Sequence, residues 1–229
     1  MKRLGLLTVS IFATLAVCAF AMTSMAAALP EISLPSGTWK GKNDGSGATA
    51  KPTLETLKLA KIVCNKAEGK GADTSNTLGT FTIDFEECEE PKNKVKCSTS
   101  GDSTGIILTD GTYHYVWDSL TTLGIAVLFL PLEVTIECTA LVKIKVKQQS
   151  ANGGLVCLIL EPTSSKVTHL LHCEQELGDQ KEKTYWNDSG TAITNAELLC
   201  STNGAAFETC AELALAEVNN TFSVSWSNV

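Results

Sequence analysis

A five-residue motif has the composition of a serine-protease nucleophile loop. Residues 101–105 read GDSTG, one residue away from the GDSGG that carries the nucleophile of chymotrypsin-like proteases. In that class the histidine base precedes the serine in the chain. Here the first histidine, His114, follows Ser103, and no recognisable motif flanks His169 or His172. We therefore interpret GDSTG as a turn between strands and expect no catalytic residue.

Histidine and glutamate side chains are also the groups that would bind a metal ion. His169 and His172 would share one face of a helix, but on a strand they point apart, and the flanking valine and leucines favour a strand. Four glutamates lie within residues 86–90, without the loop spacing of a calcium site. We interpret this acidic cluster as a solvated strand end, and we expect no metal site and no cofactor.

Two stripes of side chains alternate along predicted strands and could bind a ligand. Tyr113, Tyr115 and Trp117 point to one face. That face is either a carbohydrate-stacking platform, which makes these three the candidate ligand-binding residues, or a stripe of the core. The second stripe contains the lysines of residues 143–147. It could dock an anionic cell-wall polymer, although a wet strand face or edge protection is the interpretation that we favour.

Cysteine is the residue type whose count says most about the protein. The chain has nine, and Cys18 lies in the apolar N-terminal run. An even set of eight in an exported chain predicts four disulfides, and the absence of a CxxC pair argues against a metal site. The eight are Cys64, Cys88, Cys97, Cys138, Cys157, Cys173, Cys200 and Cys210.

The spacing of the cysteines suggests how they pair. A hairpin with Lys92 and Asn93 at its tip places Glu89 opposite Lys96, and then the flanking cysteines also face each other. Two further short spacings suggest two more stapled hairpins, and the last pair is long-range. Eight cysteines allow 105 connectivities, so this set is a hypothesis. The expected pairs are Cys64–Cys138, Cys88–Cys97, Cys157–Cys173 and Cys200–Cys210.

The elements that would position these residues are predominantly strands. Apolar and polar residues alternate over 80–86, 142–147 and 222–227, and the apolar run 123–132 is typical of a buried strand. The dipeptides Asp110-Gly111, Asn152-Gly153 and Asn203-Gly204 favour tight turns. Residues 192–199 and 207–218 could be short helices, and the second segment is ambiguous between helix and strand.

The N-terminus has the pattern of a secretory signal peptide. Lys2 and Arg3 precede an apolar run that ends in the small residues Ala26 to Ala28, so we expect residues 1–28 to be removed. Bulky Val17 before Cys18 argues against a lipoprotein. The mature chain then has no arginine and a net charge of about −9, which disfavours nucleic-acid binding. No later apolar run approaches the roughly 20 residues of a membrane span.

Domain organisation follows from the same patterns. We expect an N-terminal segment over residues 29–52 that includes a mobile glycine-rich loop. A single β domain follows over residues 53–229, with a weak seam near residues 148–154.

Several cysteine-bearing segments occur in a characteristic order. They read KIVCNKAEGKG, FTIDFEEC, KVKCSTSG, VTIEC and GLVCLILEP. Their order and spacing resemble a broad set of uncharacterised secreted proteins from actinobacteria. The resemblance implies export and a β-rich architecture, and it carries over no catalytic residue. The cysteines at 157, 173, 200 and 210 are additions to the common pattern.

These observations predict an all-β fold, either an antiparallel sandwich or a partly open barrel, stapled by disulfides and with at most one or two short helices. The favoured function is a secreted or cell-surface binding or structural protein without catalysis, with cell-wall glycan or another surface protein as partner. Two alternatives stay open: a β-barrel carrier of a small apolar ligand, and an extracellular hydrolase without a recognisable motif. A closed cavity above about 300 Å³ would favour the carrier, and an exposed aromatic row would favour glycan binding.

Overall fold

The computed structural model describes residues 31–32, 37–43, 51–58, 60–121, 124–138, 142–161, 166–187, 189–224 and 226–227. Every regular element within these ranges is a β-strand. The expected signal peptide, residues 1–28, and most of the expected glycine-rich loop lie outside the described residues. None of the described segments forms a helix that is long and apolar enough to cross a membrane.

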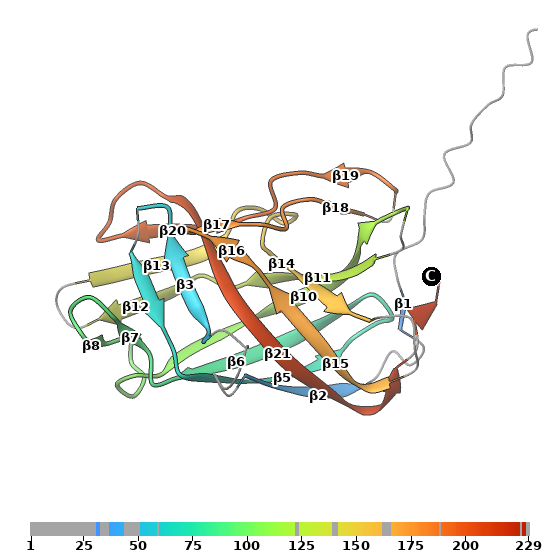
Figure 1. Ribbon diagram of the computed structural model, residues 1–229, viewed down its shortest axis with the longest axis horizontal. Helices are drawn as coiled ribbons and strands as arrows, with labels where there is room; N and C mark the ends of the chain where they lie inside the picture. The colour runs from blue at the N-terminus through green and yellow to red at the C-terminus, as the bar shows by residue number, and fades with distance from the viewer. Residues whose placement is uncertain are drawn as a thin grey trace, which may run out of the picture.

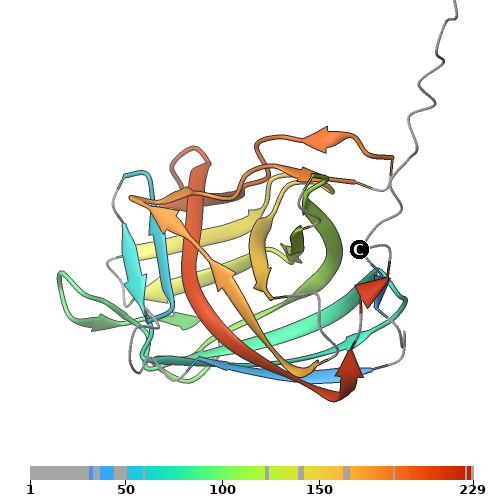
Figure 2. The same ribbon diagram turned by 45° about the vertical axis from the view of Figure 1, so that its right-hand side comes forward.

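Eight antiparallel strands close into a barrel. Their order around it is β2, β5, β6, β10, β11, β14, β15 and β21, and β21 pairs again with β2. Figure 2 shows the strands curving around a common interior. The expected alternatives were a sandwich or a partly open barrel, and the structure has the barrel. The barrel strands are β2 (Thr38–Asn43), β5 (Lys66–Asp73), β6 (Leu78–Glu86), β10 (Ile107–Ser119), β11 (Gly124–Pro131), β14 (Leu155–Leu160), β15 (Lys166–Cys173) and β21 (Glu208–Val224).

A second sheet continues the barrel at one end and shares β21 with it (Figure 1). Its pairings run from β21 through β20, β13 and β12 to β9, and from β21 through β3, β4 and β7 to β8. The strands of this sheet are β3 (Thr53–Thr56), β4 (Lys61–Val63), β7 (Glu89–Glu90), β8 (Val95–Lys96), β9 (Ser98–Thr99), β12 (Val134–Cys138), β13 (Val142–Gln148) and β20 (Leu198–Thr202).

Short strand pairs complete the described structure. One of them joins the two ends of the described chain, with Ile32 opposite Trp226. Another attaches to the barrel through Trp117 of β10, which lies opposite Trp186. The short pairs are β1 (Glu31–Ile32) with β22 (Trp226–Ser227), β16 (Gln175–Glu176) with β17 (Asp179–Gln180), and β18 (Tyr185–Trp186) with β19 (Ala192–Ile193).

The core follows from the period-two pattern of the strands. Alternate side chains of each barrel strand point inward, and most of the large inward side chains, such as Phe81, Trp117 and Ile125, are buried. The core cluster extends from the barrel into the second sheet through Ile62, Ile136 and others. The prediction of a buried strand over residues 123–132 is confirmed, because seven of the eight residues of β11 are buried.

The structure has no helix in either segment that could have been helical. Residues 207–218, which were ambiguous between helix and strand, fall almost entirely in β21, and residues 192–199 contain β19 and the start of β20. The predicted turn at Asp110-Gly111 is also absent, because β10 runs straight through it. Gly111 serves packing there, since a Cβ atom at this position would overlap the Phe81 ring and the Leu130 carbonyl. The turn at Asn203-Gly204 is present, and it joins the paired strands β20 and β21.

The cysteines form four disulfides, of which two differ from the expected pairs. Cys64 bonds to Cys88, and Cys97 bonds to Cys138, in place of Cys64–Cys138 and Cys88–Cys97. The other two, Cys157–Cys173 and Cys200–Cys210, have the expected partners.

The expected hairpin explains why the first two pairs were wrong. Its register is as predicted, with Glu89 opposite Lys96. Each of its cysteines, however, has a second strand on its other side. Val63 pairs with Glu89, which brings Cys64 beside Cys88. Ser98 pairs with Glu137, which brings Cys97 beside Cys138. The hairpin is therefore fastened to β4 and β12, and its own two arms are not cross-linked.

The barrel also includes part of residues 29–52, which we expected to form an N-terminal segment outside the β domain. Strand β2, within residues 29–52, pairs on both sides inside the barrel. Near residues 148–154 the chain turns, with the amide of Gln149 donating to the carbonyl of Gly153 at 3.0 Å. The turn passes the chain from β13 in the second sheet to β14 in the barrel.

Candidate functional site

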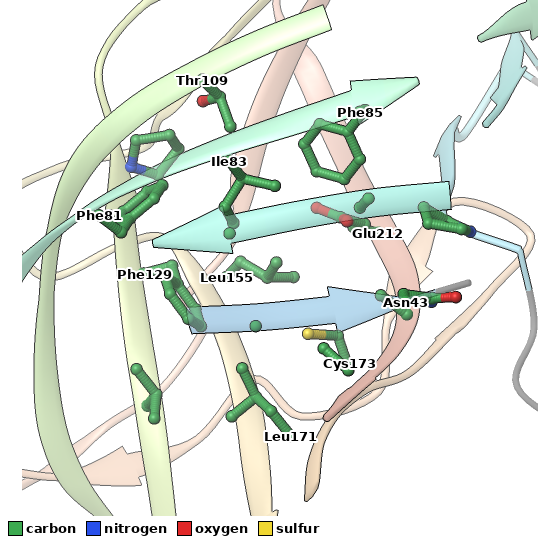
Figure 3. Close-up of a pocket in the computed structure, with 18 of the residues that line it drawn as sticks. Asn43, Phe81, Ile83, Phe85, Thr109, Phe129, Leu155, Leu171, Cys173 and Glu212 are labelled. Carbon is green, nitrogen blue, oxygen red and sulfur yellow. The ribbon is translucent and has the colours of Figure 1, made fainter. Parts of the chain in front are cut away.

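The barrel contains a mostly apolar, partly open cavity with a volume of about 190 Å³. The cavity extends from the barrel interior toward the second sheet, where Leu54, Ile62 and Ile136 also line it. Figure 3 shows side chains of several strands pointing into this space. Members of the lining include Ile83, Phe85, Phe129, Leu155, Leu171 and Val218.

Small residues on three neighbouring strands leave the room for the cavity. Strands β2, β5 and β21 lie side by side. Their inward positions include Gly41, Gly69, Ala67, Ala214 and Ala216, all of which line the cavity. Large side chains from β6, β10 and β11, such as Phe85, Tyr113 and Phe129, line another part of the wall. The barrel is therefore packed on one side and hollow on the other.

A buried hydrogen-bond network connects the three barrel strands β2, β5 and β10. The phenol of Tyr113 donates to Asp73 Oδ1 at 2.5 Å, and the phenol of Tyr115 donates to the same oxygen at 2.9 Å. The indole Nε1 of Trp39 donates to the Tyr113 oxygen at 3.0 Å. Burial raises the pKa of Asp73, and the two phenol hydrogen bonds oppose that rise. Burial also raises the pKa of both tyrosines.

Trp39 lies flat against the backbone of β5, which fixes one boundary of the cavity. A Cβ atom at Gly71 would overlap the Trp39 ring and the carbonyl of Thr80. The ring also meets Tyr113 edge to face, with 6.0 Å between centroids. The network is thus rigidly held and already satisfied internally, so we assign it to structure.

Glu212 is the acidic side chain that points into the cavity (Figure 3). It lies on β21 opposite Leu54, where this strand passes from one sheet to the other. The residue is partly accessible, yet burial raises the pKa of its carboxyl group to about 7. It makes no hydrogen bond or ion pair with any residue that the structure describes. An ionisable group thus faces a mostly apolar space without a protein partner.

The candidate aromatic row does not form a surface platform. Tyr113, Tyr115 and Trp117 are 2%, 8% and 1% exposed, so all three point inward. Tyr113 and Tyr115 border the cavity, whereas Trp117 belongs to the core beyond it. The core interpretation of this stripe is therefore correct, and a glycan could not stack on it.

The candidate catalytic and metal-binding residues are spread over the molecule. Ser103 lies in an exposed turn before β10, and His114 lies seven residues into that strand. On β15, His169 points into the cavity, while His172 points outward with its Nδ1 3.4 Å from Glu174. The prediction that the two histidines diverge is confirmed. The described residues contain no group of three or more metal-ligating side chains.

The predicted charged stripe and acidic cluster are engaged in local pairs. Lys143 lies 2.7 Å from Glu137, and Lys145 lies 3.3 Å from Glu133. Strand β13 has a neighbour on each side, so the lysines do not protect a sheet edge. In the acidic cluster, Glu86 pairs with a lysine and Glu90 accepts backbone hydrogen bonds from its own turn.

Sequence reasoning missed Glu212. The signal was present in the alternation Glu212, Ala214, Ala216, Val218, in which a single acid occupies the apolar face of a strand. The ambiguity between helix and strand over residues 207–218 concealed it, because only a strand places these four side chains on one face.

Comparisons with known proteins identify no relative. No family model, curated protein or solved structure matches the chain.

Proposed function

We propose that the protein is a secreted, non-catalytic binding protein that holds a small, mainly apolar ligand inside its barrel. The observation that carries this proposal is the mostly apolar, partly open cavity on the hollow side of the barrel. Eight-stranded barrels have an interior just large enough to be filled by side chains or to hold one small ligand. Here the glycines and alanines of three adjacent strands leave part of the interior unfilled.

The cavity volume limits the size of the ligand. At about 190 Å³ it does not reach the roughly 300 Å³ that we expected of a carrier and at which pockets for drug-sized molecules begin, so the proposed ligand must be smaller than a drug-sized molecule. An engineered apolar cavity of about 150 Å³ in another protein holds benzene. A ligand of about eight non-hydrogen atoms, such as one aromatic ring with a short substituent, therefore fits the present cavity.

The disulfides support the extracellular part of the proposal. Four disulfides fasten the described strands, and disulfides persist in oxidising compartments. An exported binding protein would meet its ligand in dilute solution, where enclosure compensates for a small contact area. Cell-wall attachment is not part of this proposal.

Titration calorimetry with ethylbenzene tests the proposed function. We expect saturable binding of one molecule per chain. Ala216→Leu should abolish it, because the larger side chain would occupy the hollow side of the barrel. Ala206→Leu, the same change at an exposed position, is the matched control and should leave binding unchanged. Equal binding by both variants would refute the proposal, and so would the absence of binding by both ethylbenzene and polar probes of the same size.

A further inference from the structure

The unpartnered carboxyl group of Glu212 indicates which apolar ligands the cavity would select. This inference rests on the proposed function and goes one step further, to the chemistry of the ligand. Buried charged groups in proteins are almost always paired or hydrogen-bonded. Glu212 has no such partner among the described residues, and it points into the cavity.

The surroundings of Glu212 restrict what could pair with it. The lining near it includes Ile83, Phe85 and Leu155, which offer no hydrogen-bond donor, and the amide of Asn43, which forms no hydrogen bond with it. Two basic side chains, Lys42 and His169, also line the cavity, and neither forms an ion pair with Glu212. No described residue donates to this carboxylate, so a ligand can supply the donor.

We propose that the barrel binds small primary or secondary amines that carry one compact apolar group, with the protonated nitrogen donating to the carboxylate of Glu212. The apolar group would occupy the hollow side against Ala214 and Ala216. A cationic ligand also suits the net charge of −7 that the whole chain carries.

The balance of desolvation costs favours this pairing. Burying an ion pair is costly when both partners leave water. Glu212 is already partly buried in the unliganded protein, so part of the desolvation cost of its carboxylate is met on folding. The ligand contributes only the desolvation of its ammonium group, and it gains a charge-assisted hydrogen bond in an apolar setting. An anionic ligand of the same shape would instead be repelled by the negative charge of the Glu212 carboxylate.

Four probes of matched size separate this inference from the proposed function. They are benzylamine, benzyl alcohol, ethylbenzene and benzoate, each titrated at pH 8 into the full chain. We expect benzylamine to bind at least about tenfold more tightly than ethylbenzene, which is the scale of one hydrogen bond to a charged group. Benzoate should bind most weakly. If none of the four binds, the proposed function itself fails, and the inference fails with it.

The Glu212→Gln variant tests the role of the carboxylate. It should weaken benzylamine binding by about ten- to a hundredfold and change ethylbenzene binding by less than about twofold. Glu217→Gln, which removes an acid from the outward face of the same strand, is the control. If ethylbenzene binds as well as benzylamine, or if Glu212→Gln leaves the amine's affinity unchanged, the amine inference is wrong while the carrier function stands.

Proton exchange on binding gives a readout that does not depend on the variant folding. Because burial holds the pKa of Glu212 near 7, benzylamine binding at pH 6.5 should release a proton from this carboxyl group. Calorimetry in two buffers of different ionisation enthalpy measures that release. Lys42, Tyr113, Tyr115 and His169 also line the cavity, and a histidine ordinarily titrates near this pH. Ethylbenzene in the same buffers therefore serves as reference, and equal proton exchange for both probes would overturn the inference.

Discussion

Two carboxyl groups inside the barrel show how the same residue chemistry can serve structure or binding. Asp73 accepts two phenol hydrogen bonds, and its network is complete without any ligand. Glu212 faces the cavity with no protein donor within the described residues. Burial raises the pKa of both groups, but only Glu212 lacks hydrogen bonds that oppose the rise. The free carboxyl group is the one placed for a ligand.

The raised pKa of Glu212 makes a specific prediction about stability. Its folded-state pKa is about 7 against an ordinary 4.5, so the folded protein binds more protons than the unfolded chain between these values. Stability should therefore fall as pH rises from about 4.5 to about 7. Glu212→Gln should match the unmodified protein at pH 4.5 and exceed it by about 3 kcal/mol at pH 8.

Urea unfolding at the two pH values, with the disulfides intact, measures this difference. Glu217→Gln on the outward face of β21 controls for the loss of one negative charge. A Glu212→Gln variant whose advantage does not grow between pH 4.5 and pH 8 would contradict the placement of this carboxyl group in an apolar interior.

At the scale of the strands, the inward glycines divide into two kinds. Gly71 of β5 lies beneath the Trp39 ring, where no side chain fits. Gly41 of β2 faces the hollow side, where a Cβ atom would meet Val218 Cγ2 at an ordinary 3.4 Å. One kind therefore seats an aromatic ring and the other leaves space for a ligand.

This distinction predicts opposite outcomes for the same substitution. Gly71→Ala should destabilise the protein by about 3 kcal/mol, because the new methyl group forces Trp39 from its seat. Gly41→Ala should cost less than about 1 kcal/mol, since its methyl group makes only ordinary van der Waals contacts. Denaturant unfolding of the two variants provides the measurement. Equal costs would show that Trp39 does not lie against β5 as described.

The disulfides supply a second prediction at this scale. In the chain-entropy model, the loss of a cross-link costs more when its loop is longer. Cys97 and Cys138 are 41 residues apart, and Cys200 and Cys210 are 10 apart. Paired alanine substitutions should cost about 4 kcal/mol for the first link and about 3 kcal/mol for the second. Peptide mapping of the non-reduced protein should also join Cys97 to Cys138, and a Cys88–Cys97 peptide would contradict the structure.

The positions of strands could be predicted from the sequence better than the long-range pairing between strands. Alternation located β6 and β13, and a continuous apolar run located β11, because the burial of a strand's faces is written in its own local sequence. The Cys88–Cys97 hairpin was found with its register, yet its disulfides were wrong, because their partners on β4 and β12 are set by long-range pairing. The packing role of Gly111 was not predicted for the same reason, because the Phe81 ring that lies against it belongs to another strand, β6.

At the scale of the whole molecule, β21 holds the two sheets together. This strand of 17 residues pairs with β2 and β15 in the barrel and with β3 and β20 in the second sheet (Figure 1). One strand cannot leave either sheet without disturbing the other. The binding cavity lies along this shared strand, and Glu212 occupies the place where it changes sheet.

The shared strand predicts that the two sheets unfold together. Native-state hydrogen exchange should give the amides of β21 the slowest rates. It should also give the barrel strand β11 and the second-sheet strand β13 the same free energy of opening, because both depend on β21. Exchange of β13 through a separate opening of lower free energy than that of β11 would contradict this prediction.

The small pair formed by β1 and β22 has a practical consequence. It places Glu31 opposite Ser227, so the first and last described segments meet at one pole of the molecule (Figure 1). A short peptide could therefore join those segments, and the chain could be reopened at the exposed turn around residues 101–104 without interrupting a barrel strand. Such a circular permutant would keep β21, the cavity and all four cross-links, while moving the site for an immobilising tag to the opposite pole.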